Sequence, residues 1–324
     1  MLILNQKDMQ ALLTMEEVLE VLETGFRELK EGRCVTPVRL SLELKEQQGE
    51  LLFMPAYLSG LKQCGAKVIS VFPQNPSKGK PTIFGSYLLI DATTGELLAL
   101  MEASTLTGIR TGGTSALATQ YLAREDARVM GIIGTGFQAA FQVKGMKAVR
   151  PIEEVWAYDV DRKKLEDFCR RLAPIIHVHP AVDSREVVRH ADIVVTATTS
   201  GKPVFSGKDL RPGVHINAVG AYRPNTREVD EETIKQATIV VDTFEGCLAE
   251  AGDLLIPINE GKFTAEAIHG DLGDLVTGRK RGRTSAKEVT LFESVGFAME
   301  DLVVAQRILQ KAITQNRGQR VEMF

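Results

Sequence analysis

Two glycines, Gly134 and Gly136, stand where a chain could bind the phosphates of a dinucleotide. The apolar run 129–133 before them is typical of a buried strand, and a helical pattern follows. Gly134 permits a tight turn, Gly136 lets the backbone approach a pyrophosphate, and Ala139 allows close helix–strand packing. The helix N-terminus offers N–H groups and partial positive charge to phosphates. We expect dinucleotide binding; a glycine turn without a ligand is the alternative. The other expected contacts of this loop are Phe137 and Gln138.

An acidic residue, Asp159, closes the next apolar run, about 20 residues beyond the glycines. A carboxylate at this position accepts hydrogen bonds from the adenosine ribose and repels a 2′-phosphate. NAD(H) is therefore the preferred cofactor. Arg162 keeps NADP(H) open as the alternative, because a nearby arginine can accommodate the 2′-phosphate.

Two later apolar runs end in small or hydroxyl side chains. Ligands of parallel sheets lie outside the carboxyl ends of the strands, so we expect both ends to line the nicotinamide side. Ordinary strand-end turns are the alternative. The residues are Thr198, Val219, Gly220 and Ala221.

The pattern of hydrophobic residues changes along the chain and indicates two lobes. Residues 8–31 have the spacing of one amphipathic helix, and residues 35 to about 101 are predicted to form short strands of an antiparallel sheet. A helix over 107–124 follows, and then strands and helices alternate as far as 242. This predicts an α/β fold: a Rossmann-type doubly wound parallel sheet with an N-terminal α+β lobe. Residues 288–312 are predicted to form one long helix.

Composition excludes several classes of protein. A net charge of −3 gives no sign of nucleic-acid binding, and no apolar stretch is long enough to cross a membrane. The four cysteines have no C-x-x-C spacing and the five histidines form no ligand motif, so no metal site is expected. Without a cleavable hydrophobic start, a cytoplasmic enzyme is the default expectation.

Several motifs together resemble the ornithine cyclodeaminase/μ-crystallin family over nearly the whole chain. Besides the glycine loop, they are Gly65-Ala-Lys67-Val, the segment 75–85, Leu106-Thr-Gly-Ile-Arg110-Thr-Gly-Gly, the segment 270–278 and Phe292-Glu-Ser294-Val-Gly296. The resemblance implies a homodimer, with a substrate-binding and dimerisation lobe at 1–110 with 296–324 and an NAD(P)-binding Rossmann domain at 111–295. It also implies reactions that range from cyclodeamination to amino-acid dehydrogenation and ketimine reduction.

Three cations gather around the substrate carboxylate by this resemblance: Arg39, Lys67 and Arg110. An arginine fork binds a carboxylate bidentately. A lysine in mid-strand is partly desolvated, which lowers its pKa and lets it manage the proton that accompanies hydride transfer. Paired surface charges are the alternative. Arg110 and Thr111 begin a helical stretch rich in small residues, so we also expect them to contact the cofactor phosphates. The resemblance places Thr82 and Ser294 near the nicotinamide or its ribose, and Thr82 and Tyr222 are expected near the substrate.

The segment Gly220-Ala-Tyr222-Arg223 departs from the cyclodeaminase pattern. Cyclodeaminases and the related alanine dehydrogenase carry an aspartate where Tyr222 stands. A phenol is a poor base at neutral pH, and Arg223 beside it disfavours an ammonium side chain. We therefore expect an oxidoreductase that reduces an imine of a 2-oxo acid, such as pyrroline-2-carboxylate. An ammonia lyase of the ornithine cyclodeaminase type with bound NAD is the alternative, and a binding protein without turnover is the third.

Overall fold

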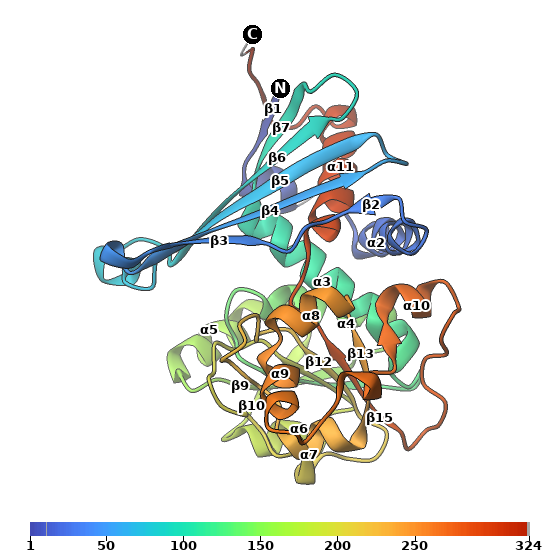
Figure 1. The fold of residues 1–324 in the computed structure, drawn as a ribbon. Helices are drawn as coiled ribbons and strands as arrows, with labels where there is room; N and C mark the ends of the chain where they lie inside the picture. The colour runs from blue at the N-terminus through green and yellow to red at the C-terminus, as the bar shows by residue number, and fades with distance from the viewer. Residues whose placement is uncertain (11, 323–324) are drawn as a thin grey trace. The chain divides into compact units, whose positions relative to one another are not determined.

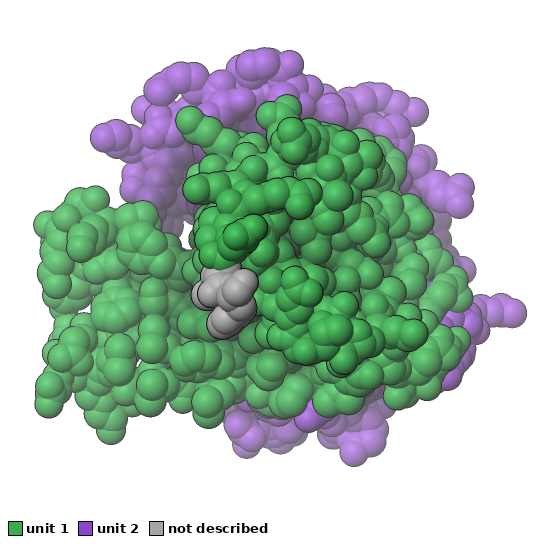
Figure 2. All heavy atoms as spheres, turned by 90° about the horizontal axis from the view of Figure 1, so that it is seen from above, with its two compact units in different colours: residues 1–110, 297–324 green, residues 111–296 purple. Residues whose placement is uncertain are grey.

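The computed structural model describes residues 1–10 and 12–322 and divides into two compact units. Unit 1 comprises Met1–Arg110 with Phe297–Phe324, and unit 2 comprises Thr111–Gly296 (Figure 2). The expected lobes differ from these units only in the place of Gly296. Residues 323 and 324 of the expected first lobe lie outside the described residues.

Unit 1 is built on a mostly antiparallel sheet (Figure 1). Its order is β16-β1-β7-β6-β5-β4-β2, and β3 also pairs with β4. The pair β1–β7 is parallel, which the strand pattern did not indicate. The strands are β1 (Leu2–Leu4), β2 (Cys34–Val35), β3 (Leu40–Leu44), β4 (Gly49–Leu58), β5 (Gln63–Val71), β6 (Ile83–Asp91), β7 (Leu97–Glu102) and β16 (Gln319–Arg320).

The single helix expected over residues 8–31 is wrong. The chain forms α1 (Gln6–Gln10) and α2 (Met15–Lys30), and Ala11 lies outside the described residues. Thr14 starts α2 because its hydroxyl accepts from the backbone N–H of Glu17, whose carboxylate accepts from the N–H of Thr14. This reciprocal cap satisfies two backbone donors, so a new helix begins at Met15. The spacing of the apolar residues does not reveal this break.

The long helix expected over 288–312 is also wrong in its first part. Residues Val289–Glu293 form strand β15, and helix α11 covers Ala298–Thr314. Gly296 separates them with a φ of +70°, a left-handed conformation that glycine adopts without strain. Helix α11 packs on β4 and β5 and against α2, within unit 1.

Unit 2 holds a sheet of eight strands, all paired in parallel. Its order is β10-β9-β8-β11-β12-β15-β13-β14, which reverses direction at β8. The expected Rossmann-type sheet is confirmed. The strands are β8 (Val129–Ile133), β9 (Glu154–Tyr158), β10 (His177–Pro180), β11 (Ile193–Thr196), β12 (His215–Ala218), β13 (Ala237–Val241), β14 (Gly270–Asp271) and β15 (Val289–Glu293).

Helices cover both faces of this sheet. Residues of α6, α7, α8 and α9 share one core with alternate residues of the central strands. On the other face, Asn217 of β12 donates to Thr119 of α3 and contacts the sulfur of Met146 in α4. The helices are α3 (Ala103–Leu122), α4 (Ala139–Val149), α5 (Arg162–Leu172), α6 (Ser184–His190), α7 (Glu231–Gln236), α8 (Phe244–Glu250), α9 (Gly252–Asn259) and α10 (Leu272–Val276). Short 3₁₀ turns occur at Lys45–Gln47, Asn75–Lys78, Gly207–Asp209 and Ala265–Ala267.

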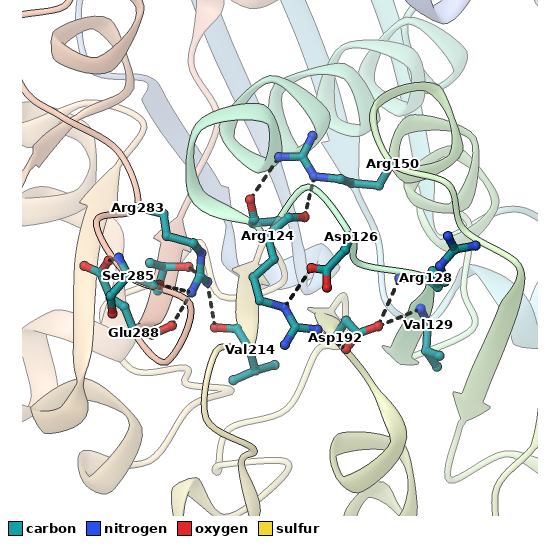
Figure 3. A network of polar contacts seen from close by, with 12 residues as sticks. Arg124, Asp126, Arg128, Val129, Arg150, Asp192, Val214, Arg283, Ser285 and Glu288 are labelled. Atoms are coloured by element: carbon teal, nitrogen blue, oxygen red, sulfur yellow. Dashed lines mark hydrogen bonds and ion pairs between the residues drawn. The ribbon is translucent and has the colours of Figure 1, made fainter.

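Three arginines tie together the amino ends of the strands of unit 2 (Figure 3). Arg150 donates to the carbonyls of Thr119 and Ala123, at the carboxyl end of α3. Arg283 donates to the carbonyl of Val214, just before β12, and Arg124 pairs with Asp192, just before β11. Because the strands are parallel, these contacts lie at the edge opposite their carboxyl ends. The network is structural.

Candidate functional site

Lys67 is a fully buried lysine in the middle of β5. Strand β5 pairs with β4 and β6 on its two sides, and Lys67 stands opposite Tyr87 of β6. Its ammonium donates to Asp301 Oδ2 at 2.6 Å and to Thr107 Oγ1 at 3.4 Å. An ammonium has three donors, so one remains for a further acceptor.

Arg110 joins the same cluster from α3. Its Nη1 donates to Glu300 Oε2 at 2.5 Å, and its Nε lies 3.4 Å from Asp301 Oδ1. Glu300 and Asp301 are consecutive in α11, and neither is exposed. We call Lys67, Arg110, Glu300 and Asp301 the charge cluster. Two cations and two anions thus compensate one another where unpaired charges would be costly.

Burial sets the protonation of Lys67. Desolvation lowers the pKa of its ammonium to about 8, against the raising effect of Asp301, and the charges of Arg110 and Arg39 lower it further. Arg39 is half-buried directly before β3, so the structure brings all three expected cations into one electrostatic neighbourhood. A lysine with this pKa can exchange its proton near neutral pH.

Thr82 does not join this cluster. It precedes β6, and its carbonyl accepts from the N–H of Phe72. Tyr87, the cross-strand partner of Lys67, lies five residues further along, which corresponds to roughly 16 Å of extended strand.

The glycine loop of unit 2 follows β8, at the point where the strand order reverses. Gly134 has a φ of +95°, and its N–H donates to the carbonyl of Tyr158 at the end of β9. A Cβ at Gly134 would lie 2.6 Å from the carbonyl oxygen of Ala197, so only glycine fits. Gly136 is exposed, and a Cβ there would meet no atom within 4 Å. The first glycine therefore shapes the turn, and the second leaves open space beside the backbone.

The start of α4 fits a phosphate group. Gln138 is its N-cap residue and makes no side-chain cap hydrogen bond. Within the described chain, Gln138 Oε1 and Thr111 Oγ1 are buried without a hydrogen-bond partner. Phe137 is half-exposed and packs on Phe141, while Ala139 is fully buried as the first residue of α4. Open backbone and unused polar atoms are what a bound dinucleotide needs here.

Besides the ribose contact expected from its spacing, the carboxylate of Asp159 makes hydrogen bonds within the protein. Its Oδ2 accepts from the N–H and hydroxyl of Thr135, at 2.8 and 3.0 Å, and Oδ1 accepts from the N–H of Asp161. The carboxylate thus fixes the glycine loop to the end of β9. Arg162 is exposed at the start of α5 and donates to the carbonyl of Ala181.

Glu228 organises the carboxyl ends of β11 and β12. This buried carboxylate accepts from the N–H of Thr198, the hydroxyl of Thr196 and the N–H of Gly220. Burial raises its pKa despite these bonds. The expected residues Thr198, Val219, Gly220 and Ala221 therefore lie together at one edge of the sheet.

Comparison with known proteins agrees with this arrangement. The family model described as ornithine cyclodeaminase/mu-crystallin family matches residues 1–316. The chain belongs to this family. The resemblance inferred from the motifs is thereby confirmed.

Three similar proteins of the ornithine cyclodeaminase/mu-crystallin family illustrate its range. A Delta(1)-pyrroline-2-carboxylate reductase of Bacillus cereus is 41% identical over 99% of this chain and 100% of its own. The structure of the Thermococcus litoralis Delta(1)-pyrroline-2-carboxylate reductase in complex with NADH and L-proline is 40% identical, with a TM-score of 0.96 over 99% of this chain and 100% of the other. An archaeal alanine dehydrogenase dimer with bound NAD is 36% identical, with a TM-score of 0.91 over 100% and 99%.

In the present chain, the expected site residues Ser294 and Tyr222 both contact other residues of unit 2. Ser294 donates its hydroxyl to Asp242 Oδ2 at 2.9 Å, and the same oxygen accepts from the N–H of Gly296. Tyr222 packs against the core of unit 2, and the guanidinium of Arg223 lies 5.5 Å from its ring centre. A cation therefore stands next to the position where the cyclodeaminase pattern has an acid.

Sequence reasoning missed the acids Asp301, Glu300, Glu228 and Asp242. A signal existed for the first two, because adjacent carboxylates interrupt an otherwise apolar stretch of α11. Acids almost never lie buried unless paired, so these imply buried cations. Across residues 1–10 and 12–322, no helix is long and apolar enough to cross a membrane, and no cluster of metal ligands occurs.

Proposed function

We propose that this protein is an NAD(H)-dependent oxidoreductase that reduces the imine of a 2-oxo acid, with Δ1-pyrroline-2-carboxylate as the first candidate substrate. The observation that carries the proposal is the charge cluster, in which a buried lysine and an arginine contact the same carboxylate, that of Asp301. The similarity to the Thermococcus litoralis enzyme, whose structure holds NADH and L-proline, supports the same substrate class.

The cofactor-binding part of the proposal rests on unit 2. The open backbone at Gly136 and the start of α4 would hold the pyrophosphate, and the unused side-chain oxygen of Gln138 lies at the same helix end. The carboxylate of Asp159 would accept from the ribose and favour NAD(H) over NADP(H). When bound, a reduced nicotinamide supplies the hydride for the imine carbon.

The substrate part rests on unit 1. Arg110 is fixed by Glu300 and Asp301, and with Arg39 it would bind the carboxylate of the substrate. Lys67, or a water that it orders, would give one proton to the imine nitrogen as the carbon is reduced, so that imine, hydride and proton become a secondary amine. A pKa of about 8 leaves most of Lys67 charged at pH 7 and able to act as this acid.

A homodimer is part of the proposal. Strand β3 exposes two leucines, Leu40 at 64% and Leu42 at 50%, next to its partner β4. Exposed apolar side chains along an edge strand favour burial against another chain. The similar archaeal alanine dehydrogenase is a dimer. Sedimentation of the protein at micromolar concentration tests this, and a monomer there would refute it.

The deciding experiment follows NADH and NADPH absorbance with pyrroline-2-carboxylate, piperideine-2-carboxylate, and pyruvate with ammonia or methylamine. Stoichiometric NADH consumption with at least one imine is the expected result. NADH oxidation with none of them would refute the proposal.

Cyclodeamination remains the second candidate because the family includes it. In that reaction ammonia leaves and no net redox change occurs. Ornithine with NAD⁺ is the counter-assay. Catalytic ammonia release without a change in NADH absorbance would replace reduction by cyclodeamination, a result that the cation of Arg223 beside Tyr222 argues against.

A further inference from the structure

Asp301 holds a central place in the charge cluster, because its two carboxylate oxygens face different cations. Oδ2 accepts from Lys67 at 2.6 Å, and Oδ1 lies 3.4 Å from Nε of Arg110. Its neighbour Glu300 contacts Nη1 of Arg110 instead. Oδ1 has no hydrogen-bond partner of good geometry within the described chain, so the bond to Lys67 is the short one that orients this carboxylate.

We propose that Asp301 is a positioning residue that keeps the Lys67 ammonium protonated and directed, so that Lys67 can give its proton to the imine nitrogen. The inference rests on the proposed function for the identity of the proton acceptor. The effect of Asp301 on Lys67 itself does not depend on that function.

The groups that face Lys67 act in opposite directions. Arg110 from α3 and Arg39 from the segment before β3 disfavour its charge, as does burial between β4 and β6. Thr107 and the buried hydroxyl of Tyr87 are neutral, and the Tyr87 hydroxyl has no partner within the described residues. The acid that bonds to Lys67 is Asp301, on α11. Its loss would leave the ammonium with Thr107 as a hydrogen-bond partner and with the charges of Arg110 and Arg39 nearby, while Glu300 contacts Arg110.

The consequence is a loss of protons at Lys67 in the working pH range. Lys67 already has a pKa of about 8 with Asp301 in place. An opposite charge at hydrogen-bond distance shifts the pKa of its partner by about 1–3 units, so removing that charge would make Lys67 mostly neutral at pH 7–8. A neutral lysine has no proton to give, and an unpaired side chain has no fixed direction.

Two variants separate charge from position. Asp301→Asn keeps the shape and removes the charge, while Asp301→Glu keeps the charge and moves it by one methylene. Glu23→Gln is the matched control, because Glu23 is a half-exposed acid of unit 1 in an ion pair with Arg27. Each protein is labelled with [ε-¹³C]lysine, the Lys67 signal is assigned with Lys67→Met, and its titration is followed by NMR. The pH profile of kcat with pyrroline-2-carboxylate is recorded in parallel.

In Asp301→Asn, the Lys67 titration is expected to move down by about 1–3 pH units. The high-pH limb of kcat, where activity falls as Lys67 loses its proton, should move down with it. In Asp301→Glu the titration should stay near the wild-type value while kcat falls about 10–100-fold and KM changes little, because the proton donor is misplaced. Glu23→Gln should change neither.

An unchanged Lys67 titration in folded Asp301→Asn would overturn the proposal. If that variant does not fold, Asp301→Glu carries the test, and an unchanged kcat there would overturn the positioning role. The NMR titration needs no turnover. Wild-type protein that reduces no imine would therefore refute the proposed function, while the Lys67 titration would still decide whether Asp301 holds its proton.

Discussion

The charge cluster of unit 1 and the glycine loop of unit 2 are built in opposite ways. In the cluster, side chains from β5, α3 and α11 meet over long separations in sequence, such as 234 residues between Lys67 and Asp301. In the loop, the backbone bends locally. The hydrogen bond from Thr135 to Asp159 joins residues that are only 24 positions apart in the sequence. The cluster is buried and charged, whereas Gly136 at the tip of the loop is exposed and has no side chain.

This difference teaches where each site is vulnerable. A change in the cluster leaves a buried charge unpaired, which costs several kcal/mol, and in the proposed mechanism it also affects the proton donor. A change at the tip of the loop meets empty space in the folded chain and affects only what binds there. The two sites should therefore lose different measurable functions.

Substitution of Lys67 should have the largest effect on turnover. Lys67→Met keeps an unbranched apolar side chain in β5 but removes the ammonium. A missing general acid typically lowers kcat about 10²–10⁴-fold. Binding of NADH, measured by fluorescence titration, should be unchanged because the loop of unit 2 is untouched.

Lys62→Met is the matched control, since Lys62 is an exposed lysine in the turn before β5. It should keep wild-type kcat. Equal turnover in Lys67→Met and wild type would remove Lys67 from the mechanism.

Substitution of Gly136 should give the reverse pattern. Gly136→Val adds a branched side chain where the structure leaves nothing within 4 Å, so the melting temperature should hardly change. A side chain there would keep the backbone from a pyrophosphate. Losing two charge-assisted bonds of about 1.5–3 kcal/mol each weakens NADH binding by about 100-fold or more.

Gly201→Val is the matched control in the same unit. Gly201 is also exposed, and a Cβ there would also meet nothing within 4 Å, but it follows β11 and is not part of the glycine loop. Its NADH affinity should equal that of wild type. Normal NADH affinity in Gly136→Val would contradict the assignment of the loop as the pyrophosphate site.

The two regions also differ in how far the sequence predicts them. The loop could be predicted residue by residue, because turn geometry and strand–helix rhythm are local. Lys67 and Arg110 were identified through family motifs, but their partners Glu300 and Asp301 were not. Nothing in local spacing states that α11 packs on β5, so the pairing depends on tertiary structure.

The errors in secondary structure have the same origin. Residues 289–293 were expected in a helix, yet they form a central strand of unit 2 between β12 and β13. A short, mostly apolar segment such as Val-Thr-Leu-Phe-Glu fits either state, and the neighbouring strands in the sheet decide. The break before Met15 was missed because the capping box at Thr14 leaves the apolar spacing nearly intact. The parallel sheet itself was predictable, since strands such as β8, β11 and β13 are mostly apolar and alternate with helices.

The smallest expected effect concerns Asp159, which combines features of the charge cluster and of the glycine loop. Its carboxylate is a charged side chain, as in the cluster, but it is tied to the local backbone of the loop. Asp159→Asn keeps an oxygen for Thr135 and loses the charge that repels a 2′-phosphate. We expect the preference for NADH over NADPH in kcat/KM to fall about 10-fold. This corresponds to the lower end of the free energy of a hydrogen bond to a charged group, because the oxygens of Asp159 already accept bonds from the protein. Asp167→Asn, which changes a half-exposed acid of α5, should leave the ratio unchanged. If Asp159→Asn also leaves it unchanged, the discrimination lies elsewhere, and the exposed guanidinium of Arg162 becomes the group to test.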